Sequence, residues 1–281
     1  MNTDLRFKPS DWALILGASS GFGGATAIAL AKHGMNICGV HFDRAATMPL
    51  AEQVKKEIDA TGAQSLFFNV NAADPGKRNE VLDSLKSQVE KSNDAQVRVV
   101  MHSLAFGTLR PYISEKPEMM MTQQQIEMTM DVMANSLVYW VQGAFTRKLL
   151  RKGSRIYAMT SSGGRTQIPD YGAVSAAKAA LESHIRQLTM EMGAFGITAN
   201  AIMAGVTDTP ALRKIPANAK LITTARGKNP QMRLTSPEDI AKAIVLITHE
   251  YGDFIAGQIV AVDGGEEIVS YIGQKNAREL E

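Results

Sequence analysis

The sequence is poor in cysteine, with Cys38 as the single thiol among 281 residues. One thiol cannot form an intramolecular disulfide, and it cannot ligate a thiolate zinc site or an iron–sulfur cluster. The five histidines are scattered, without the spacing that metal ligands show. We therefore predict that the protein has no metal site and belongs to a reducing compartment, the cytoplasm.

Neither sign of charge dominates, and no long apolar run is present. Thirty Lys and Arg against 28 Asp and Glu leave a net charge of +2, which is too balanced for a general polyanion-binding surface. No run approaches the roughly 18 to 20 apolar residues that span a bilayer. The start, MNTDLRFKPSDW, lacks the apolar core of a signal peptide. We expect a protein that binds no nucleic acid, crosses no membrane and is not exported.

Short apolar runs alternate regularly with longer amphipathic stretches. The runs, interpreted as strands, are 12–16, 36–40, 66–70, 97–101, 155–159, 198–203 and 258–262. The helical patterns are 24–33, 50–60, 77–91, 123–150, 173–192 and 237–249. This order predicts an α/β fold: a single Rossmann-type doubly wound domain over residues 1–281, with a seven-stranded parallel sheet and helices on both faces.

Two segments fall outside this alternation. Residues 205–235 hold no strand pattern and carry six cations against one acid, Asp208. We interpret this segment as a substrate lid that attracts an anionic ligand or partner, with a solvated loop as the alternative. The tail, 266–281, is predicted to be a surface or subunit-contact segment. The six cations of the lid are Arg213, Lys214, Lys220, Arg226, Lys228 and Arg233.

A glycine-rich loop follows the first predicted strand and leads directly into the first predicted helix. Glycines let the backbone turn tightly and approach a pyrophosphate, whose charge the helix N-terminus favours. The position between strand and helix is the one that dinucleotide binding requires. The residues expected to bind the cofactor here are Gly17, Ser19, Ser20, Gly21, Phe22 and Gly23.

The spacing of these glycines, G-x3-G-x-G, resembles that of the short-chain dehydrogenase/reductase family, and the resemblance covers nearly the whole chain. Where an acid would bind the ribose 2′-hydroxyl of NAD, the second strand ends in His41. The absence of an acid there, with Arg44 available for a 2′-phosphate, favours NADP(H) over NAD(H). Asp43 and the lack of a cation at Ser20 argue for NAD(H).

The resemblance also implies contacts farther along the chain. Asn71 and Ala72, after the third strand, and Ser103 and Ala105, after the fourth, would lie at the adenosine half of the cofactor. A turn residue is the alternative interpretation of Asn71. The residues implied at the nicotinamide half are Gly205, Thr207 and Thr209, of which Thr209 has helix capping as its alternative role.

The candidate catalytic residues are Tyr171, Lys178 and Ser161. Most of the family carries Tyr-x3-Lys, in which the lysine holds the nicotinamide ribose and lowers the phenol pKa. Here Val174 occupies that tyrosine position, and Tyr171 lies seven residues, about two helical turns, before Lys178. Ser161 matches the family's substrate-orienting serine, with a merely structural strand-end serine as the alternative.

Tyr-x6-Lys is the pattern of the enoyl-acyl carrier protein reductases of this family. When a hydride enters C3 of an enoyl thioester, the oxyanion forms at C1, so a displaced tyrosine suits that reaction. The stretch from His102 to Gly107 is also similar to these reductases, and the stretches 106–111 and 205–212, with Met232-Arg233, look like the NADPH-dependent type of some bacilli. Where many members carry a proton-relay asparagine this chain has Met133, and Asn135 lies about 200° away on a regular helix.

The resemblance implies NAD(P)H-dependent reduction of the trans-2 double bond of enoyl-acyl carrier protein or enoyl-CoA thioesters in fatty acid biosynthesis. The implied partner is an acyl carrier protein or acyl-CoA substrate, and the implied assembly is a homotetramer. Two alternatives stay open: a short-chain carbonyl reductase or alcohol dehydrogenase, and a catalytically silent NADP(H)-sensing protein, which the missing tyrosine at Val174 permits.

Overall fold

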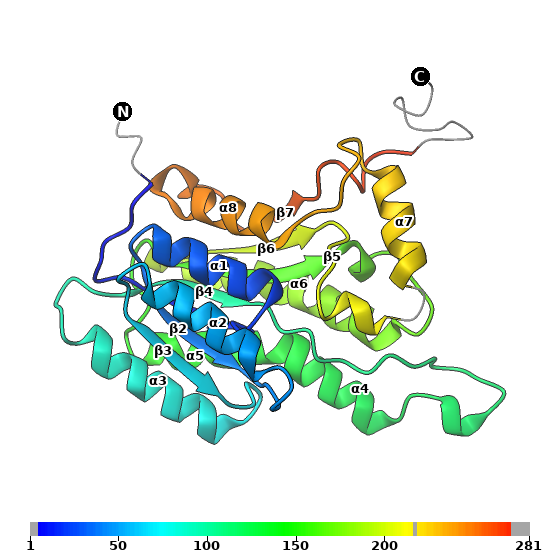
Figure 1. Cartoon of the computed structure of the whole chain (residues 1–281). Helices are drawn as coiled ribbons and strands as arrows, with labels where there is room; N and C mark the ends of the chain where they lie inside the picture. The colour runs from blue at the N-terminus through cyan, green and yellow to red at the C-terminus, as the bar shows by residue number, and fades with distance from the viewer. Residues whose placement is uncertain (1–4, 216–217, 271–281) are drawn as a thin grey trace.

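The computed structural model describes residues 5–215 and 218–270, and its centre is one parallel sheet of seven strands in the order β3-β2-β1-β4-β5-β6-β7 (Figure 1). This confirms the predicted Rossmann-type doubly wound fold. The strands are β1 (Trp12–Leu16), β2 (Asn36–His41), β3 (Ser65–Asn69), β4 (Val97–His102), β5 (Arg155–Ser161), β6 (Thr198–Ala204) and β7 (Ile259–Val262).

Burial on both faces explains why the strand residues read as continuous apolar runs. Every residue of β1 and β2 is buried, and β5 is buried except at its last residue. β1 lies between β2 and β4, where the strand order reverses. In such a sheet, ligands bind in the crevice outside the carboxyl ends of the strands at this point.

Helices cover the sheet on both sides (Figure 1). Leu30, Ile58 and Ile244 of α1, α2 and α8 belong to the core on one face. Trp140 and Leu181 of α5 and α6 belong to the core on the other, together with α3. The helices are α1 (Gly21–Lys32), α2 (Met48–Asp59), α3 (Pro75–Val89), α4 (Gln123–Met130), α5 (Ser136–Thr146), α6 (Gly172–Met192), α7 (Asn218–Lys228) and α8 (Pro237–Thr248).

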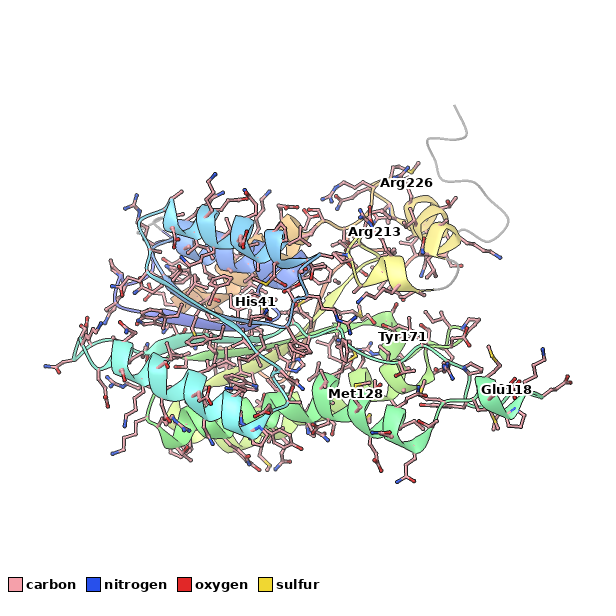
Figure 2. All side chains as sticks on the ribbon, turned by 60° about the horizontal axis from the view of Figure 1, so that its bottom comes forward. His41, Glu118, Met128, Tyr171, Arg213 and Arg226 are labelled. Atoms are coloured by element: carbon pink, nitrogen blue, oxygen red, sulfur yellow. The ribbon has the colours of Figure 1, made fainter. Side chains whose placement is uncertain are left out.

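The helix predicted over 123–150 is not one regular helix. A π-helical turn, η2 (Asp131–Asn135), separates α4 from α5, and α5 ends at Thr146. The Ser136 hydroxyl donates to the Val132 carbonyl at 2.8 Å, which satisfies a backbone group near this irregular turn. The chain before α4 projects away from the sheet and carries the short 3₁₀-helix η1 (Pro117–Met119), with Glu118 at its tip (Figures 1 and 2).

The predicted lid contains elements that the sequence did not indicate: the 3₁₀-helix η5 (Leu212–Lys214) and the helix α7. Of the predicted tail, residues 266–270 are described, and 271–281 lie outside the described residues. The remaining 3₁₀-helices are η3 (Ser162–Gly164), η4 (Gly193–Phe195) and η6 (Glu250–Gly252). Within the described ranges, no helix has the length and apolar character needed to cross a membrane.

Candidate active site

The glycine loop between β1 and α1 is locked to the two neighbouring strands. The Gly17 N–H donates to the Val40 carbonyl at 2.8 Å, and the Ser103 N–H donates to the Leu16 carbonyl at 2.8 Å. Gly17 has a left-handed φ of +90°, and a Cβ at this position would overlap the Ser103 carbonyl oxygen. The loop therefore requires glycine at position 17, as the nucleotide-binding interpretation expects.

The start of α1 has no side-chain cap. Ser20 is the N-cap residue but makes no side-chain capping bond, so it does not satisfy the first N–H groups of the helix. A Cβ on Gly23 would overlap the Gly17 carbonyl, so the helix begins pressed against the loop. Gly21, with φ +54°, lies beside the Thr209 side chain of the predicted lid. These contacts bring the loop and the lid together at one edge of the sheet.

At the end of β2, His41 and Asp43 form a pair. His41 is buried, and its Nδ1 lies 2.9 Å from Asp43 Oδ2. Burial raises the pKa of the Asp43 carboxyl, but hydrogen bonds from Thr47, Ser19 and His41 outweigh it, and the net pKa lies below its usual value. Arg44 is exposed. The contact from Asp43 to Ser19 ties an ionised carboxylate to the glycine loop, a contact that sequence spacing did not reveal.

Asn71 and Ala72 serve the structure in visible ways. The Asn71 Oδ1 accepts from the Ala73 N–H at 3.0 Å, which is the turn role given above as the alternative. Ala72 is buried in the core, and its carbonyl accepts from Trp140 Nε1 at 2.9 Å. Ala105 is exposed just beyond β4. The predicted contacts of these residues with a cofactor remain predictions.

Tyr171 and Ser161 meet at the carboxyl edge of the sheet. Tyr171 is the N-cap residue of α6 rather than part of the helix, and the Ser161 side chain hydrogen-bonds to its phenol. Burial raises the pKa of Tyr171, and the Ser161 bond offsets this only in part. A Cβ on Gly163 would lie 2.7 Å from Tyr171 Cε1. Figure 2 labels His41, at the end of β2, and Tyr171.

Lys178 is buried on α6, with 6% of its surface exposed. Its Nζ donates to the Met159 carbonyl at 2.7 Å. Burial lowers the pKa of Lys178 to about 8, and the carboxylate of Glu182 opposes this shift. The lysine is thus fixed behind the end of β5, two helical turns from Tyr171, as the Tyr-x6-Lys spacing predicts.

The position of the usual family tyrosine is filled by apolar packing. Val174 is 5% exposed, and a Cβ on Gly107 would lie 2.7 Å from Val174 Cγ2 and 2.9 Å from Met133 Sδ. Asn135 Oδ1 lies 3.2 Å from His184 Nε2. The asparagine is therefore engaged with α6 through a histidine, whereas Met133 packs into the core.

His102 acts as a neutral structural group. It is fully buried, and its Nε2 lies 2.9 Å from Ser136 Oγ. Because the Ser136 hydroxyl donates to the Val132 carbonyl, it accepts from His102. Burial, together with the charge of Lys178, lowers the pKa of His102 to about 3. This histidine links β4 to the π-helical turn.

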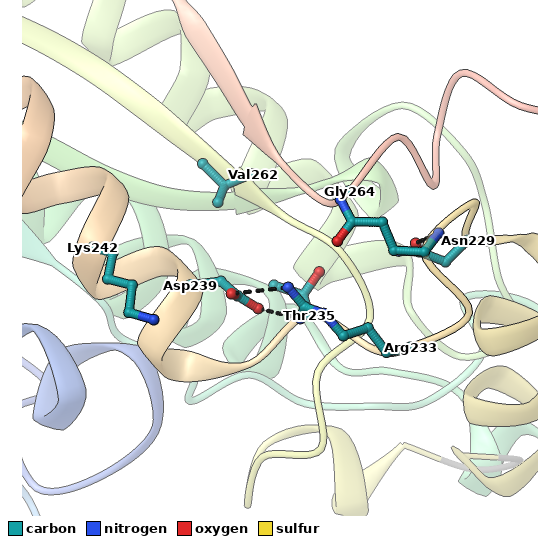
Figure 3. Close-up of a pocket in the computed structure, with 8 residues that line it drawn as sticks. Asn229, Arg233, Thr235, Asp239, Lys242, Val262 and Gly264 are labelled. Atoms are coloured by element: carbon teal, nitrogen blue, oxygen red, sulfur yellow. Dashed lines mark hydrogen bonds and ion pairs between the residues drawn. The ribbon is translucent and has the colours of Figure 1, made fainter.

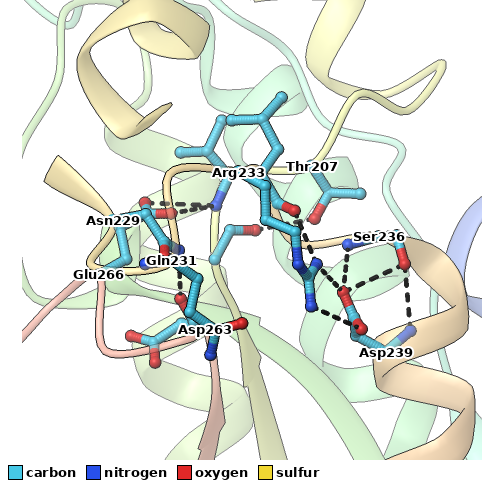
Figure 4. Close-up of polar contacts among 11 residues, drawn as sticks. Thr207, Asn229, Gln231, Arg233, Ser236, Asp239, Asp263 and Glu266 are labelled. Carbon is cyan, nitrogen blue, oxygen red and sulfur yellow. Dashed lines mark hydrogen bonds and ion pairs between the residues drawn. The ribbon is translucent and has the colours of Figure 1, made fainter. Parts of the chain in front are cut away.

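The lid is anchored at its start by a carboxylate. Both oxygens of the buried Glu266 lie 3.3 Å from the Val206 nitrogen (Figure 4). A Cβ on Gly205 would lie 2.5 Å from Thr235 Oγ1 and 2.9 Å from Glu266 Oε2. The glycine is therefore required for this close packing, in addition to its predicted place near the nicotinamide.

The two threonines of the lid start are both buried and both bonded to the backbone. The Thr207 hydroxyl donates to the Gly205 carbonyl at 2.9 Å. Thr209 Oγ1 accepts from the N–H of Leu212, the first residue of η5, at 3.2 Å, although the N-cap residue of η5 is Ala211. Their predicted roles toward a nicotinamide remain predictions.

A pocket of about 270 Å³ lies between the lid end, α8 and β7 (Figure 3). Its polar groups are largely satisfied by each other or by backbone: Arg233 pairs with Asp239 at 2.5 Å, and Asn229 Nδ2 donates to the Asp263 carbonyl at 2.8 Å. A second pocket, of about 330 Å³, is lined by residues of α3, α5 and the loop after α5. Neither Tyr171 nor Lys178 lines either pocket.

Half of the lid cations are neutralised locally. Arg213 pairs with Asp208 at 2.8 Å, and Lys228 pairs with Glu267 at 3.6 Å. Arg233 pairs in the same way with Asp239. These three ion pairs make the effective positive charge of the lid smaller than the number of its cations suggests. The exposed lid cations with no carboxylate partner among the described residues are Lys214, Lys220 and Arg226.

Comparisons with known proteins agree with this geometry. The family model described as Enoyl-(Acyl carrier protein) reductase matches residues 17–267. The "NADPH-dependent aldehyde reductase-like protein, chloroplastic" of Arabidopsis thaliana is 28% identical over 262 residues, 90% of this chain and 93% of that protein. The enoyl-[acyl-carrier-protein] reductase [NADH] FabI of Buchnera aphidicola is 28% identical over 170 residues, 60% of this chain and 64% of its own length.

Among solved structures, FabI from Candidatus Liberibacter asiaticus superposes with a TM-score of 0.79 at 24% identity, covering 96% of this chain and 99% of that one. At this identity the superposition shows the shared fold. The match of the family model is broader evidence, because it runs from the glycine loop through Tyr171 and Lys178 to the lid anchor at Glu266. The chain belongs to the short-chain dehydrogenase/reductase family, in the group whose model is described as Enoyl-(Acyl carrier protein) reductase.

Proposed function

We propose that the protein is an NAD(P)H-dependent enoyl-acyl carrier protein reductase of fatty acid biosynthesis. The observation that carries this proposal is the pairing of Tyr171 with Ser161, while Val174 fills the usual tyrosine position with apolar packing. A tyrosine displaced along the chain suits an oxyanion that forms at C1, two carbons from the C3 atom that receives the hydride. The description of the matching family model supports the same reaction.

In this mechanism, the bound cofactor supplies the hydride. A tyrosine is ordinarily protonated at neutral pH, and burial raises the pKa of Tyr171 further, so its hydroxyl can donate to the developing enolate oxygen. Ser161 holds the phenol in place through its hydrogen bond. In this mechanism Lys178 would hold the nicotinamide ribose through the Nζ donors that the Met159 carbonyl does not use.

The direct test is the loss of reduced-nicotinamide absorbance with crotonyl and longer enoyl thioesters, using NADPH and NADH in parallel. Oxidation of cofactor that depends on the enoyl thioester would support the proposal. Turnover of a ketone panel without enoyl activity would instead establish a carbonyl reductase, the class named for the Arabidopsis relative. Tight cofactor binding without any turnover would establish the sensing protein.

For the cofactor, we propose NADP(H) over NAD(H), on the exposed Arg44 next to the ribose position at His41. Arg44→Ala should raise the KM for NADPH about tenfold and leave the KM for NADH within twofold, because the variant removes a partner of the 2′-phosphate. Asp43→Asn is the matched variant, since it removes the charge that would bind a ribose 2′-hydroxyl. A wild type that prefers NADH, and whose KM for NADH rises in Asp43→Asn, would contradict the proposed preference for NADP(H).

For the partner, we propose an acidic acyl carrier protein docking on the lid cations, with acyl-CoA as a surrogate. Reversing Lys214 and Arg226, two lid cations with no carboxylate partner among the described residues, to Glu should raise the KM for the carrier-bound substrate about tenfold, with a steep dependence on salt. The control substrate is the uncharged crotonyl N-acetylcysteamine thioester, whose KM should not change. Reversal of Lys55 and Lys56 on α2, away from the lid, is the matched control variant. An unchanged KM for the carrier substrate would refute this docking.

The proposal extends to a cytoplasmic homotetramer. The single cysteine fits a reducing compartment, and the assembly follows from the family resemblance. Light scattering coupled to size-exclusion chromatography measures the assembly directly, and a mass near that of one 30.4 kDa chain would refute it.

A further inference from the structure

Glu182 is a buried carboxylate beside the candidate catalytic residues, and the mechanism above gives it no role. It lies on α6 one helical turn after Lys178, so both side chains share one face of the helix. Each of the two residues is 6% exposed. A buried carboxylate is costly unless it is paired or hydrogen-bonded, so its contacts identify what retains it.

Two consecutive residues of β5 hold this pair. The Met159 carbonyl accepts from Lys178 Nζ at 2.7 Å, and the Thr160 hydroxyl donates to Glu182 Oε1 at 2.8 Å. The strand end therefore fixes both the cation and the carboxylate. Since β5 continues directly to Ser161, the same strand end also orients Tyr171.

The segment after β5 covers this pair from the other side. A Cβ on Gly164 would lie 3.2 Å from Lys178 Cβ and 3.5 Å from Glu182 Oε1. Arg165 Nε lies 3.9 Å from Glu182 Oε2, and the Arg165 side chain is 55% exposed. The carboxylate thus accepts a hydrogen bond from Thr160 and lies within ion-pair distance of the partly exposed Arg165, while Lys178, one helical turn away, feels its charge without a direct contact.

The other titratable groups near Lys178 do not supply a negative charge. His102 of β4 is neutral because its pKa is lowered to about 3, and Tyr171 before α6 is protonated because its pKa is raised. His184, farther along α6, also has a lowered pKa because of burial. Glu182 is the charge that opposes the effect of burial on Lys178.

We propose that Glu182 is a positioning residue of the active site, whose buried carboxylate on the same helix face keeps Lys178 cationic for the cofactor ribose. The inference rests on the nicotinamide binding of the proposed function. It also assigns Arg165 as a competing partner, because a cation beside Glu182 weakens the field that the carboxylate exerts on Lys178.

The test is the pH dependence of cofactor binding, measured by quenching of tryptophan fluorescence between pH 6 and 9.5. Binding should weaken as the pH rises through the pKa of Lys178, because the deprotonated amine loses its charge. Glu182→Gln keeps the size and the acceptor for Thr160 but removes the charge. We call the loss of cofactor affinity at high pH the alkaline limb of the binding curve. In this variant the alkaline limb should lie about one pH unit lower, so that the Kd at pH 8.5 rises roughly tenfold while the Kd at pH 6 stays within twofold.

Three variants separate this role from a general loss of structure. Glu182→Asp keeps a carboxylate and should restore most of the wild-type limb. Arg165→Gln, at a partly exposed position, should move the limb in the opposite direction, toward higher pH. Glu191→Gln, an exposed charge removal on the same helix, should leave it unchanged.

The failures are distinguishable. A wild type that binds neither NADPH nor NADH contradicts the proposed function, and the inference with it. If the wild type binds cofactor and its alkaline limb coincides with that of Glu182→Gln, the inference is contradicted while the proposed function stands. If Glu182→Gln melts far below the wild type, the decision passes to Arg165→Gln. In that variant the alkaline limb of cofactor binding should lie at higher pH than in the wild type, and an unchanged limb overturns the inference.

Discussion

Tyr171→Phe is expected to lower kcat for enoyl thioester reduction by about 10² to 10³-fold, because it removes one donor to the enolate oxygen. The Kd of the cofactor should stay within twofold, since the proposed mechanism assigns the phenol to the substrate and Lys178 to the ribose. Stopped-flow measurement of hydride transfer, with the cofactor Kd measured separately, gives both numbers.

The matched control is Tyr251→Phe, which removes a hydroxyl from a side chain that is 67% exposed on η6. Its kcat should equal that of the wild type. Ser161→Ala should give a smaller loss, because Ser161 acts on the phenol rather than on the substrate. A Tyr171→Phe enzyme with unchanged kcat would remove Tyr171 from the mechanism.

Gly17→Ala should destabilise the protein by roughly 3 kcal/mol, because two costs add at this position. The left-handed backbone disfavours a side chain by about 1 to 2 kcal/mol, and overlap with the Ser103 carbonyl adds about 1 to 3 kcal/mol. The melting temperature should fall by roughly 6 to 12 °C. Cofactor affinity should fall as well, because relief of the overlap displaces the loop from β4.

Gly62→Ala separates the two costs. Gly62 has a similar φ, +84°, but a Cβ there would meet nothing within 4 Å. The control variant should therefore lose only about 1 to 2 kcal/mol, the cost of the backbone conformation, and its cofactor affinity should not change. Equal losses in the two variants would show that the contact with Ser103 costs nothing.

The strands were predictable because burial on both faces leaves a strong local signal. β1 was predicted with its observed bounds, and the last strand begins one residue later than expected, at Ile259. The helix α7 was not predicted, because it is rich in polar residues and buries Ala225 but little else. Its apolar periodicity is too weak to distinguish a helix from a loop.

In the candidate site, the sequence indicated the residues but not their contacts. Tyr171 and Lys178 were found from spacing along one segment. The contacts of Glu182 and Asp43 were not predicted, because their partners Thr160 and Ser19 lie 22 and 24 residues away. Only the folded sheet brings such pairs together. The stabilising effect of one charge on another depends on distance and burial, which composition and periodicity do not contain.

The π-helical turn between α4 and α5 has a consequence for comparing this chain with its relatives. A π turn accommodates an extra residue, so the helix beyond Asn135 is rotated by about 100° relative to an uninterrupted α-helix of the same length. Counting residues from α4 therefore assigns the wrong side chains to the face that meets α6. Equivalent positions are obtained by counting from the two ends inward, and one residue of η2 has no counterpart in a relative whose helix is regular. A single-residue deletion in η2 should therefore give a regular helix in which α5 keeps its phase and Trp140 stays in the core.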